Sequence, residues 1–162
     1  MRPVTEQEIR ASFVNCSKGE AKRLAVPRDL ASLSWDDLDF LGWTDPAAPD
    51  RAYLVTDTGE RIVGIALRRA AGTGQLRRSM CSLCLTTHLG NGVSLMTARK
   101  AGKSGQLGNS VGTYICSDLA CSLYLRGKKT ADGRPNESLS LPDQVSRTMT
   151  ALTGFLAKVT DN

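Results

Sequence analysis

The chain has 162 residues, which is enough for one domain with a real hydrophobic core. Its 21 Lys and Arg residues against 16 Asp and Glu give a net charge of +5, which favours negatively charged partners. No apolar run approaches the roughly 20 residues that span a bilayer, and the N-terminus lacks the apolar segment of a secretory signal. We therefore expect a cytoplasmic protein without a membrane partner.

The first part of the chain predicts short helices. Thr5-Glu-Gln-Glu8 and Ser17-Lys-Gly-Glu20 both have the capping-box pattern, in which a hydroxyl and a carboxylate satisfy free backbone N–H groups. We expect one helix over about residues 6–14. A second helix should begin after Ser17 and end before Pro27.

The middle of the chain is rich in strand-forming residues. Four runs predict strands: residues 52–56, 61–68, 93–98 and 111–115. Asp57-Thr-Gly-Glu60 supplies the turn of a first hairpin, residues 70–75 a flexible connection, and residues 100–109 a basic, glycine-rich loop. Near the C-terminus, Ser140 is expected to cap a last helix. Its apolar stripe recurs at helical spacing: Val145, Met149, Leu152, Leu156 and Val159.

Two cysteine pairs are the most informative motif. Cys81-Ser-Leu-Cys84 is a C-x2-C, and Cys116-Ser-Asp-Leu-Ala-Cys121 is a C-x4-C that follows after a hairpin-sized insertion. A tetrahedral structural zinc ion needs two thiolates from each of two segments, at Zn–S distances of roughly 2.3 Å. We predict one structural Zn²⁺ held by these four cysteines.

Other roles for the cysteines remain open at this point. A C-x2-C can be a redox dithiol, although that motif normally opens a helix after a strand, and here it lies in a loop-like stretch. Disulfides are a second alternative, but five cysteines is an odd number and a cytosolic chain keeps its thiols reduced. His88, the only histidine, could replace a ligand, but a surface or hydrogen-bonding role fits better. Cys16 is expected to be a small, partly buried residue.

The order of elements around the cysteines predicts a treble clef. A knuckle carries the first pair, a hairpin follows, and a helix from Ser117 to about Leu125 should carry Cys116 at its entrance and Cys121 near its first turn. The expected fold class is α+β, a treble-clef zinc finger embedded in a small antiparallel sheet with flanking helices. We expect a single domain in three parts: a helical lead-in (residues 1–50), a β-rich treble-clef zinc core (51–140) and a C-terminal helix (141–162).

Charge is distributed unevenly along the chain. Residues 61–117 contain eight Lys and Arg and no Asp or Glu, whereas residues 35–60 hold seven acids against Arg51 alone. A block without acids usually faces an acidic partner, either nucleic acid or an acidic protein surface. The alternative is a solvated face that neutralises the acidic segment of the same molecule.

The sequence favours a binding protein over an enzyme. A Ser-His-Asp or Cys-His catalyst would need His88, which lies in the presumed knuckle. Gly102-Lys-Ser104 resembles the end of a phosphate-binding loop, but Thr97 stands where that motif requires its first glycine. Four cysteines also close the zinc shell, so no position is left for a catalytic water. No small-molecule substrate is expected. An enzyme remains possible only if His88 or another non-cysteine ligand touches the metal.

Three segments carry a family resemblance: Phe-Val-Asn-Cys-Ser-Lys-Gly-Glu (13–20), Arg-Ser-Met-Cys-Ser-Leu-Cys (78–84) and Gly-Asn-Ser-Val-Gly-Thr-Tyr-Ile-Cys-Ser-Asp-Leu-Ala-Cys (108–121). They are similar to the elongation factor G-binding protein family, which includes fusidic-acid resistance proteins with a C-terminal treble-clef zinc finger. The likeness covers most of the chain. It indicates a compact form without the N-terminal helical bundle of the resistance proteins.

The resemblance implies a non-enzymatic adaptor that binds zinc through Cys81, Cys84, Cys116 and Cys121, contacts elongation factor G and modulates its release from the ribosome. Family members carry an aromatic partner contact inside the first cysteine pair, where this chain has Leu83. Tyr114 matches another aromatic position of the family. As alternatives, Leu83 only packs the knuckle and Tyr114 only fills the hairpin face.

Basic residues complete the predicted partner surface: Arg77, Arg78, Arg99, Lys100 and Lys103. They would steer association with a negatively charged surface. The alternative function is an RNA- or ribosome-binding zinc module that uses the same cations on phosphates, with rRNA as the partner. Against it, residues 61–117 contain Tyr114 as their only aromatic side chain, which leaves little for base stacking.

Overall fold

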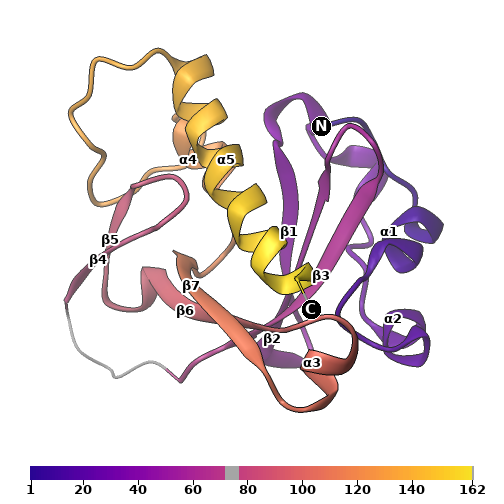
Figure 1. The fold of residues 1–162 in the computed structure, drawn as a ribbon. Helices are drawn as coiled ribbons and strands as arrows, with labels where there is room; N and C mark the ends of the chain where they lie inside the picture. The colour runs from indigo at the N-terminus through magenta and orange to yellow at the C-terminus, as the bar shows by residue number, and fades with distance from the viewer. Residues whose placement is uncertain (72–76, 162) are drawn as a thin grey trace.

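The computed structural model describes residues 1–71 and 77–161. An antiparallel five-stranded sheet forms its centre, in the order β1-β2-β3-β6-β7 (Figure 1). The strands are β1 (Phe40–Asp45), β2 (Ala48–Asp57), β3 (Ile62–Arg69), β6 (Val93–Arg99) and β7 (Ser110–Cys116). A separate two-stranded hairpin, β4 (Arg78–Met80) with β5 (Thr87–Leu89), is inserted between β3 and β6. This arrangement confirms the α+β class and the antiparallel sheet.

Helices cover the sheet on both sides. They are α1 (Glu6–Ser12), α2 (Lys18–Arg23), α3 (Gly102–Gln106), α4 (Cys121–Leu125) and α5 (Leu141–Thr160). Short 3-10 turns lie at Leu30–Ser32, Trp35–Asp37 and Gly90–Gly92. Both predicted capping boxes are present at Thr5 and Ser17, and Ser140 caps α5 as expected. Local sequence therefore decides where these helices begin.

The two faces of the sheet have different covers. On one face, α5 packs Leu152 and Val159 into a core that also contains Ile65, Met96 and the four cysteines of the two pairs. On the other face, the N-terminal segment with α1 and α2 covers only β1 to β3, through residues such as Ile9 and Trp43. The β6–β7 part of that second face is left open, with Tyr114 54% exposed.

An ion pair ties the start of β1 to the end of α4. The Arg126 guanidinium donates to both carboxylate oxygens of Asp39, at 2.7 and 2.8 Å. The two side chains are only 17% and 10% exposed, so solvent screens this pair less than a surface pair. Asp39 also raises the pKa of Arg126 through this hydrogen bond. The pair therefore holds the treble-clef helix against the first strand.

Several local predictions differ from the structure. Residues 40–50, expected in the helical lead-in, contain β1 and the start of β2. The first helix ends at Ser12 rather than near residue 14, and the loop 100–109 contains α3. Most of the predicted connection 70–75 lies outside the described residues.

The treble-clef helix begins at Cys121, not at Ser117. Leu119 has a left-handed φ of 57°, which interrupts any helix that starts earlier. The Ser117 hydroxyl donates to the Asn91 carbonyl instead of capping a helix. The hydroxyl that was expected to cap the helix therefore connects the end of β7 to the segment before β6.

Gly42 allows β1 to approach the zinc-bearing segment closely. A Cβ at this position would lie 2.3 Å from the Leu119 Cβ, so any larger residue must displace Leu119, between Cys116 and Cys121. We predict that Gly42→Ala lowers the free energy of unfolding by about 1–3 kcal/mol, because the overpacked strand has to shift. Urea denaturation measures this change.

Gly154→Ala is the matched control for this substitution. Gly154 lies in α5, and a Cβ added there would meet nothing within 4 Å, so alanine should stabilise the helix by about 1 kcal/mol. Equal effects of the two alanines would show that the Gly42–Leu119 contact does not limit the packing.

Candidate metal centre

Four thiols meet at one buried point. Their Sγ atoms all lie within 4.8 Å of one another, and all four side chains are at most 1% exposed: Cys81, Cys84, Cys116 and Cys121. The first two lie in the knuckle between β4 and β5. Cys116 ends β7 and Cys121 begins α4. The structure thus brings together the full ligand set that the sequence predicted.

The spacing of the sulfurs fits a tetrahedral zinc ion. Zn–S distances of roughly 2.3 Å imply S···S separations of about 3.8 Å. The observed separations are 3.7 Å between Cys81 and Cys121 and 3.5 Å between Cys84 and Cys116. All five cysteines are free thiols, as the sequence favoured over disulfides. The centre holds one structural Zn²⁺ through four sulfurs, and both close pairs join the knuckle to the second segment.

The backbone of the knuckle is shaped to present its two sulfurs. The Cys81 N–H donates to the Thr86 carbonyl at 2.9 Å, and the Leu85 N–H donates back to the Cys81 carbonyl at 3.0 Å. Leu85 has a left-handed φ of 59°. The Leu83 N–H points at the Cys81 sulfur, 3.4 Å away, and this donor supports a thiolate.

The second pair has a matching turn. The Leu119 N–H donates to the Cys116 carbonyl at 2.8 Å, and Leu119, like Leu85, has a left-handed φ, here 57°. A non-glycine residue in this region is costly and persists only where its surroundings hold it. Gly42 leaves the space in which Leu119 packs, and a zinc ion bound by the flanking Cys116 and Cys121 would hold this turn in place.

The electrostatics of the four thiols call for a cation. Hydrogen bonds with Cys116, Cys121 and Cys84 lower the pKa of Cys81. Hydrogen bonds with Cys116, Cys81 and Cys84, together with burial, raise the pKa of Cys121. The thiols therefore compete for protons, and four thiolates at this spacing would repel strongly. A divalent ion removes that conflict and leaves a net charge of about −2.

A hydroxyl and an imidazole lie directly behind the sulfurs. The Thr86 hydroxyl contacts the sulfur of Cys84 at 2.9 Å and that of Cys116 at 3.6 Å, and the Nε2 atom of His88 at 3.1 Å. His88 is 6% exposed, its Nε2 lies 3.5 Å from the Cys116 sulfur, and its ring packs 4.7 Å from that of Tyr124. The hydrogen-bonding role predicted for His88 is confirmed, and a surface position is wrong. Thr86 was missed, since one threonine in a loop carries no signal.

Leu83 and Tyr114 have different positions. Leu83 is 2% exposed, and its carbonyl accepts a hydrogen bond from the Thr148 hydroxyl at 3.1 Å. It packs the knuckle against α5, so the expectation that it contacts a partner is not supported by this conformation. Tyr114 is 54% exposed on β7. Its carbonyl accepts from the Ser82 N–H at 2.8 Å, which links its strand to the knuckle.

The five basic residues of the predicted surface do not form one patch. Arg77 and Arg78 lie at β4, whereas Arg99, Lys100 and Lys103 lie at the far end of β6 and in α3 (Figure 1). None of them forms an ion pair within residues 1–71 and 77–161.

The acidic segment of the chain does not neutralise this basic block. Asp37 and Asp39 pair with Lys128 and Arg126, which lie outside residues 61–117. Within the described chain, the block forms one ion pair with the acidic segment, Arg68 with Asp50, at 3.8 Å. Apart from Arg69, whose guanidinium donates to Thr44 and Ser117, and the weakly paired Arg68, the cations of this block remain available to a partner.

The β4–β5 hairpin exposes two apolar side chains that were not predicted. Met80 is 55% exposed on β4 and Leu89 is 46% exposed on β5. In this hairpin Ser79 pairs with His88 on the metal side, so Met80 and Leu89 alternate to the outside, where Leu89 pairs with Arg78. The alternation is short, only three residues in each strand, which is why the sequence did not reveal it.

The fold and its four-cysteine centre define a treble-clef zinc protein. The FBP C-terminal treble-clef zinc-finger family matches residues 8–159, and the chain belongs to this family. The structure is similar to that of the fusidic acid resistance protein FusC, with a TM-score of 0.56 and 18% sequence identity. That similarity covers 88% of this chain and 54% of FusC, so it concerns about half of the longer protein. No curated protein is significantly similar in sequence.

In the part of the chain that the structure describes, no helix has both the length and the apolar character needed to cross a bilayer.

Loss of one zinc ligand should release the metal. We predict that Cys81→Ser or Cys116→Ser loses most of the bound zinc and more than about 4 kcal/mol of unfolding free energy, because metal binding energy is folding energy. Elemental analysis and thermal unfolding measure the two effects. Cys16→Ser is the control and should keep both, since Cys16 lies outside the cluster. Full zinc content in either ligand variant would contradict the assignment.

The hydroxyl behind the sulfurs should tune zinc affinity. Thr86→Val keeps the side-chain shape but removes the contacts to Cys84, Cys116 and His88. We expect about 10- to 100-fold weaker zinc binding in competition with a chelator. Thr113→Val, half-buried on β7, is the control and should leave the affinity unchanged. An unchanged affinity in Thr86→Val would mean that the hydroxyl only fills space.

Proposed function

We propose that this chain is a non-enzymatic, zinc-dependent adaptor of the cytoplasm that binds elongation factor G and modulates its release from the ribosome. Membership of the zinc-finger family and the fold shared with FusC support this function. The observation that carries it is a group of exposed apolar side chains on the elements that the zinc ion joins: Met80, Leu89 and Tyr114. Partly exposed aromatic and methionine side chains are typical of protein interfaces.

Zinc would act on this surface by fixing its parts. The knuckle, the hairpin β4–β5 and the end of β7 share the metal centre. The Ser82–Tyr114 backbone bond joins the knuckle to the exposed tyrosine. A surface that is rigid before binding loses less conformational entropy on association. The ion therefore contributes to binding without touching the partner.

The basic residues would contribute mainly to the rate of encounter. Arg77 and Arg78 lie beside the apolar side chains of the hairpin, and Arg78 pairs directly with Leu89. Exposed charges speed association with an acidic surface and do so less at high salt. Release would follow if the adaptor binds a conformation of elongation factor G that differs from its ribosome-bound conformation. Binding would then shift the population of the factor toward the released conformation.

An RNA- or ribosome-binding module is the second candidate. The free cations favour it, because they could contact phosphates. The division of the cations into two groups and the single aromatic side chain of residues 61–117 weigh against base stacking. Protein binding therefore fits the apolar surface better.

The interface proposal predicts which side chains matter. Tyr114→Ala or Met80→Ala should weaken binding to purified elongation factor G at least about 10-fold, because exposed side chains at the centre of an interface carry most of its energy. Leu141→Ala, 42% exposed at the start of α5, is the control and should change affinity less than about 2-fold. Calorimetric titration measures all three.

The same titration also separates the two candidates. No complex with the native protein at low salt would contradict the adaptor. Tight, steeply salt-dependent binding to structured RNA without a protein partner would favour the second function instead.

A further inference from the structure

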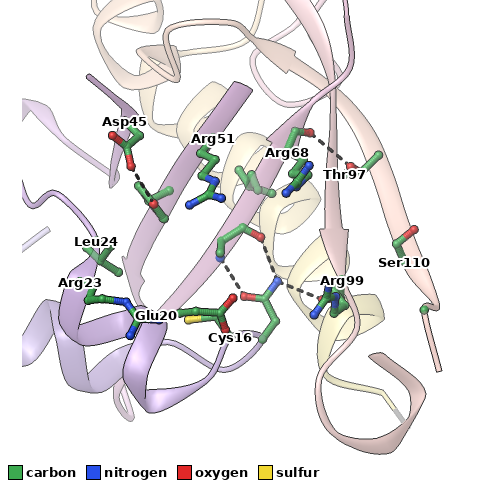
Figure 2. Close-up of a pocket in the computed structure, with 15 residues that line it drawn as sticks. Cys16, Glu20, Arg23, Leu24, Asp45, Arg51, Arg68, Thr97, Arg99 and Ser110 are labelled. Atoms are coloured by element: carbon green, nitrogen blue, oxygen red, sulfur yellow. Dashed lines mark hydrogen bonds between the residues drawn. The ribbon is translucent and has the colours of Figure 1, made fainter. Parts of the chain in front are cut away.

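A cavity of about 370 Å³ lies on the second face of the sheet, between α2 and the open part of β6 and β7. Four arginines from four different elements surround it, as Figure 2 shows. They are Arg23 of α2, Arg51 of β2, Arg68 of β3 and Arg99 of β6. The volume lies within the range of small-molecule sites. The partner surface proposed above depends on the zinc centre, whereas this cavity is built without it.

Strand register places two of these arginines directly opposite each other. Arg51 pairs with Arg68, and Arg68 pairs with Thr97, two residues before Arg99 on the same face of β6. Like charges directly opposite in neighbouring strands destabilise a sheet. The free protein therefore carries a cost here that an anion would remove.

The acidic residues of the cavity wall are already engaged. The Glu20 carboxylate accepts from the Ser17 N–H at 2.8 Å in the capping box, a bond that lowers its pKa, and the charges of Arg99 and Arg23 lower it further by smaller amounts. Asp45 accepts from the Ala47 N–H at 2.9 Å and from the Tyr53 hydroxyl at 3.1 Å. Within the residues that the structure describes, neither acid forms an ion pair with a cavity arginine.

The arginines themselves are largely unpartnered. Arg68 reaches Asp50 at 3.8 Å, but these side chains are 70% and 56% exposed, so the pair is weak. Within residues 1–71 and 77–161, Arg23, Arg51 and Arg99 form no ion pair. Their donors are free for a ligand.

The floor of the cavity is rigid. Asn15 accepts from the Ala66 N–H at 2.8 Å through its side-chain oxygen, and its amide nitrogen donates to the carbonyls of Ala66 and Arg99 at 2.9 and 3.0 Å (Figure 2). One buried side chain thus joins the segment between α1 and α2 to β3 and β6. The arginine-bearing elements are held in place before any ligand arrives.

We propose that this cavity binds a compact phosphate ligand, with a diphosphate group as the best match. Guanidinium groups bind phosphate oxygens through paired N–H donors. Four arginines against Glu20 and Asp45 leave a wall charge of about +2, which favours a multiply charged phosphate group over a singly charged anion. Tyr53, the aromatic residue of the wall, is 6% exposed and its hydroxyl is bound to Asp45, so no ring is free to stack on a base. The phosphates, and not a nucleobase, are recognised.

The direct test uses inorganic pyrophosphate with the full chain and bound zinc. The melting temperature should rise by several degrees at saturating pyrophosphate relative to potassium chloride of equal ionic strength. The double variant Arg51→Gln/Arg68→Gln should lose this rise, and Arg61→Gln, an exposed arginine outside the cavity, should keep it. The double variant leaves Arg99 intact because Arg99 also belongs to the candidate partner surface.

The melting temperature of the ligand-free double variant separates a ligand-binding role of the arginines from a purely structural one. If the cavity exists for a ligand, removal of the opposed charges should raise the melting temperature of the free double variant by about 1–3 °C while ligand binding is lost. A lower melting temperature in the free variant would assign the arginines to the fold and overturn the site. A pyrophosphate shift of equal size in the native chain and the double variant would overturn it as well.

The thiol of Cys16 reports on the location of the ligand. Cys16 lines the same cavity and is partly exposed, whereas the other four thiols hold zinc. Pyrophosphate should slow its modification by a thiol reagent in the native chain but not in the double variant. An unprotected Cys16 at saturating pyrophosphate would place the ligand elsewhere.

The source of the phosphate is distinguished by parallel titrations. Orthophosphate and a nucleoside diphosphate are compared with pyrophosphate. Equal affinities of pyrophosphate and the nucleoside diphosphate support recognition of the diphosphate group alone. Binding of RNA without any binding of pyrophosphate would overturn the proposal. Since Arg51 and Arg68 lie outside the candidate partner surface, the double variant should bind elongation factor G like the native chain, and the two proposals fail independently.

Discussion

The bond between four thiolates and one metal ion is the constraint on which the zinc-bearing half of the molecule depends. Its sulfurs come from the knuckle between β4 and β5 and from the junction of β7 with α4. Two leucines in left-handed conformations, Leu85 and Leu119, form the turns that aim the sulfurs. The ion compensates for that conformational cost. The constraint then extends outward, because Leu119 packs on Gly42 and Arg126 pairs with Asp39 in the same region.

Unequal cover on the two sides of the five-stranded sheet leaves room for the arginine cavity and exposes Tyr114. One face is closed by α5 and the metal centre, whereas α1 and α2 cover only the first three strands of the other. Alternation along β2, β3 and β6 places Arg51, Arg68 and Arg99 on this face, and all three are exposed. Two acids near β1, Asp37 and Asp39, are engaged by Lys128 and Arg126, and in the described chain the one ion pair of these cations is the exposed contact of Arg68 with Asp50. The arginine cavity therefore lies where the cover provided by α1 and α2 ends.

Sequence reasoning succeeded where the signal was local and failed where it depended on tertiary contacts. Cysteine spacing identified the ligands, and the hydroxyl–carboxylate patterns at Thr5 and Ser17 located two helix starts, because each acts over three or four residues. The strand β1 was missed because its pairing with β2 is what makes it a strand. Leu83 was assigned to a surface because no local rule distinguishes a buried knuckle residue from an exposed one. The arginine cavity was invisible for the same reason, since its members are brought together by strand register.

The relative position of the two candidate surfaces is set by side chains more than by the sheet itself. The ladder that joins β3 to β6 contains only two residue pairs, Arg68 with Thr97 and Arg69 with Met96. Further hydrogen bonds cross this short junction. Asn15 bonds to Ala66 and Arg99, the Ala70 N–H donates to the Leu95 carbonyl at 2.9 Å, and Arg69 donates to the carbonyl of Ser117 at 2.6 Å. The Asn15–Arg99 bond ends at the wall of the arginine cavity, and the Arg69–Ser117 bond ends at the residue after Cys116. The short ladder therefore does not leave β6 and β7 loose, because the buried Asn15 connects β6 to the N-terminal half and the half-buried Arg69 connects β3 to the residue after Cys116.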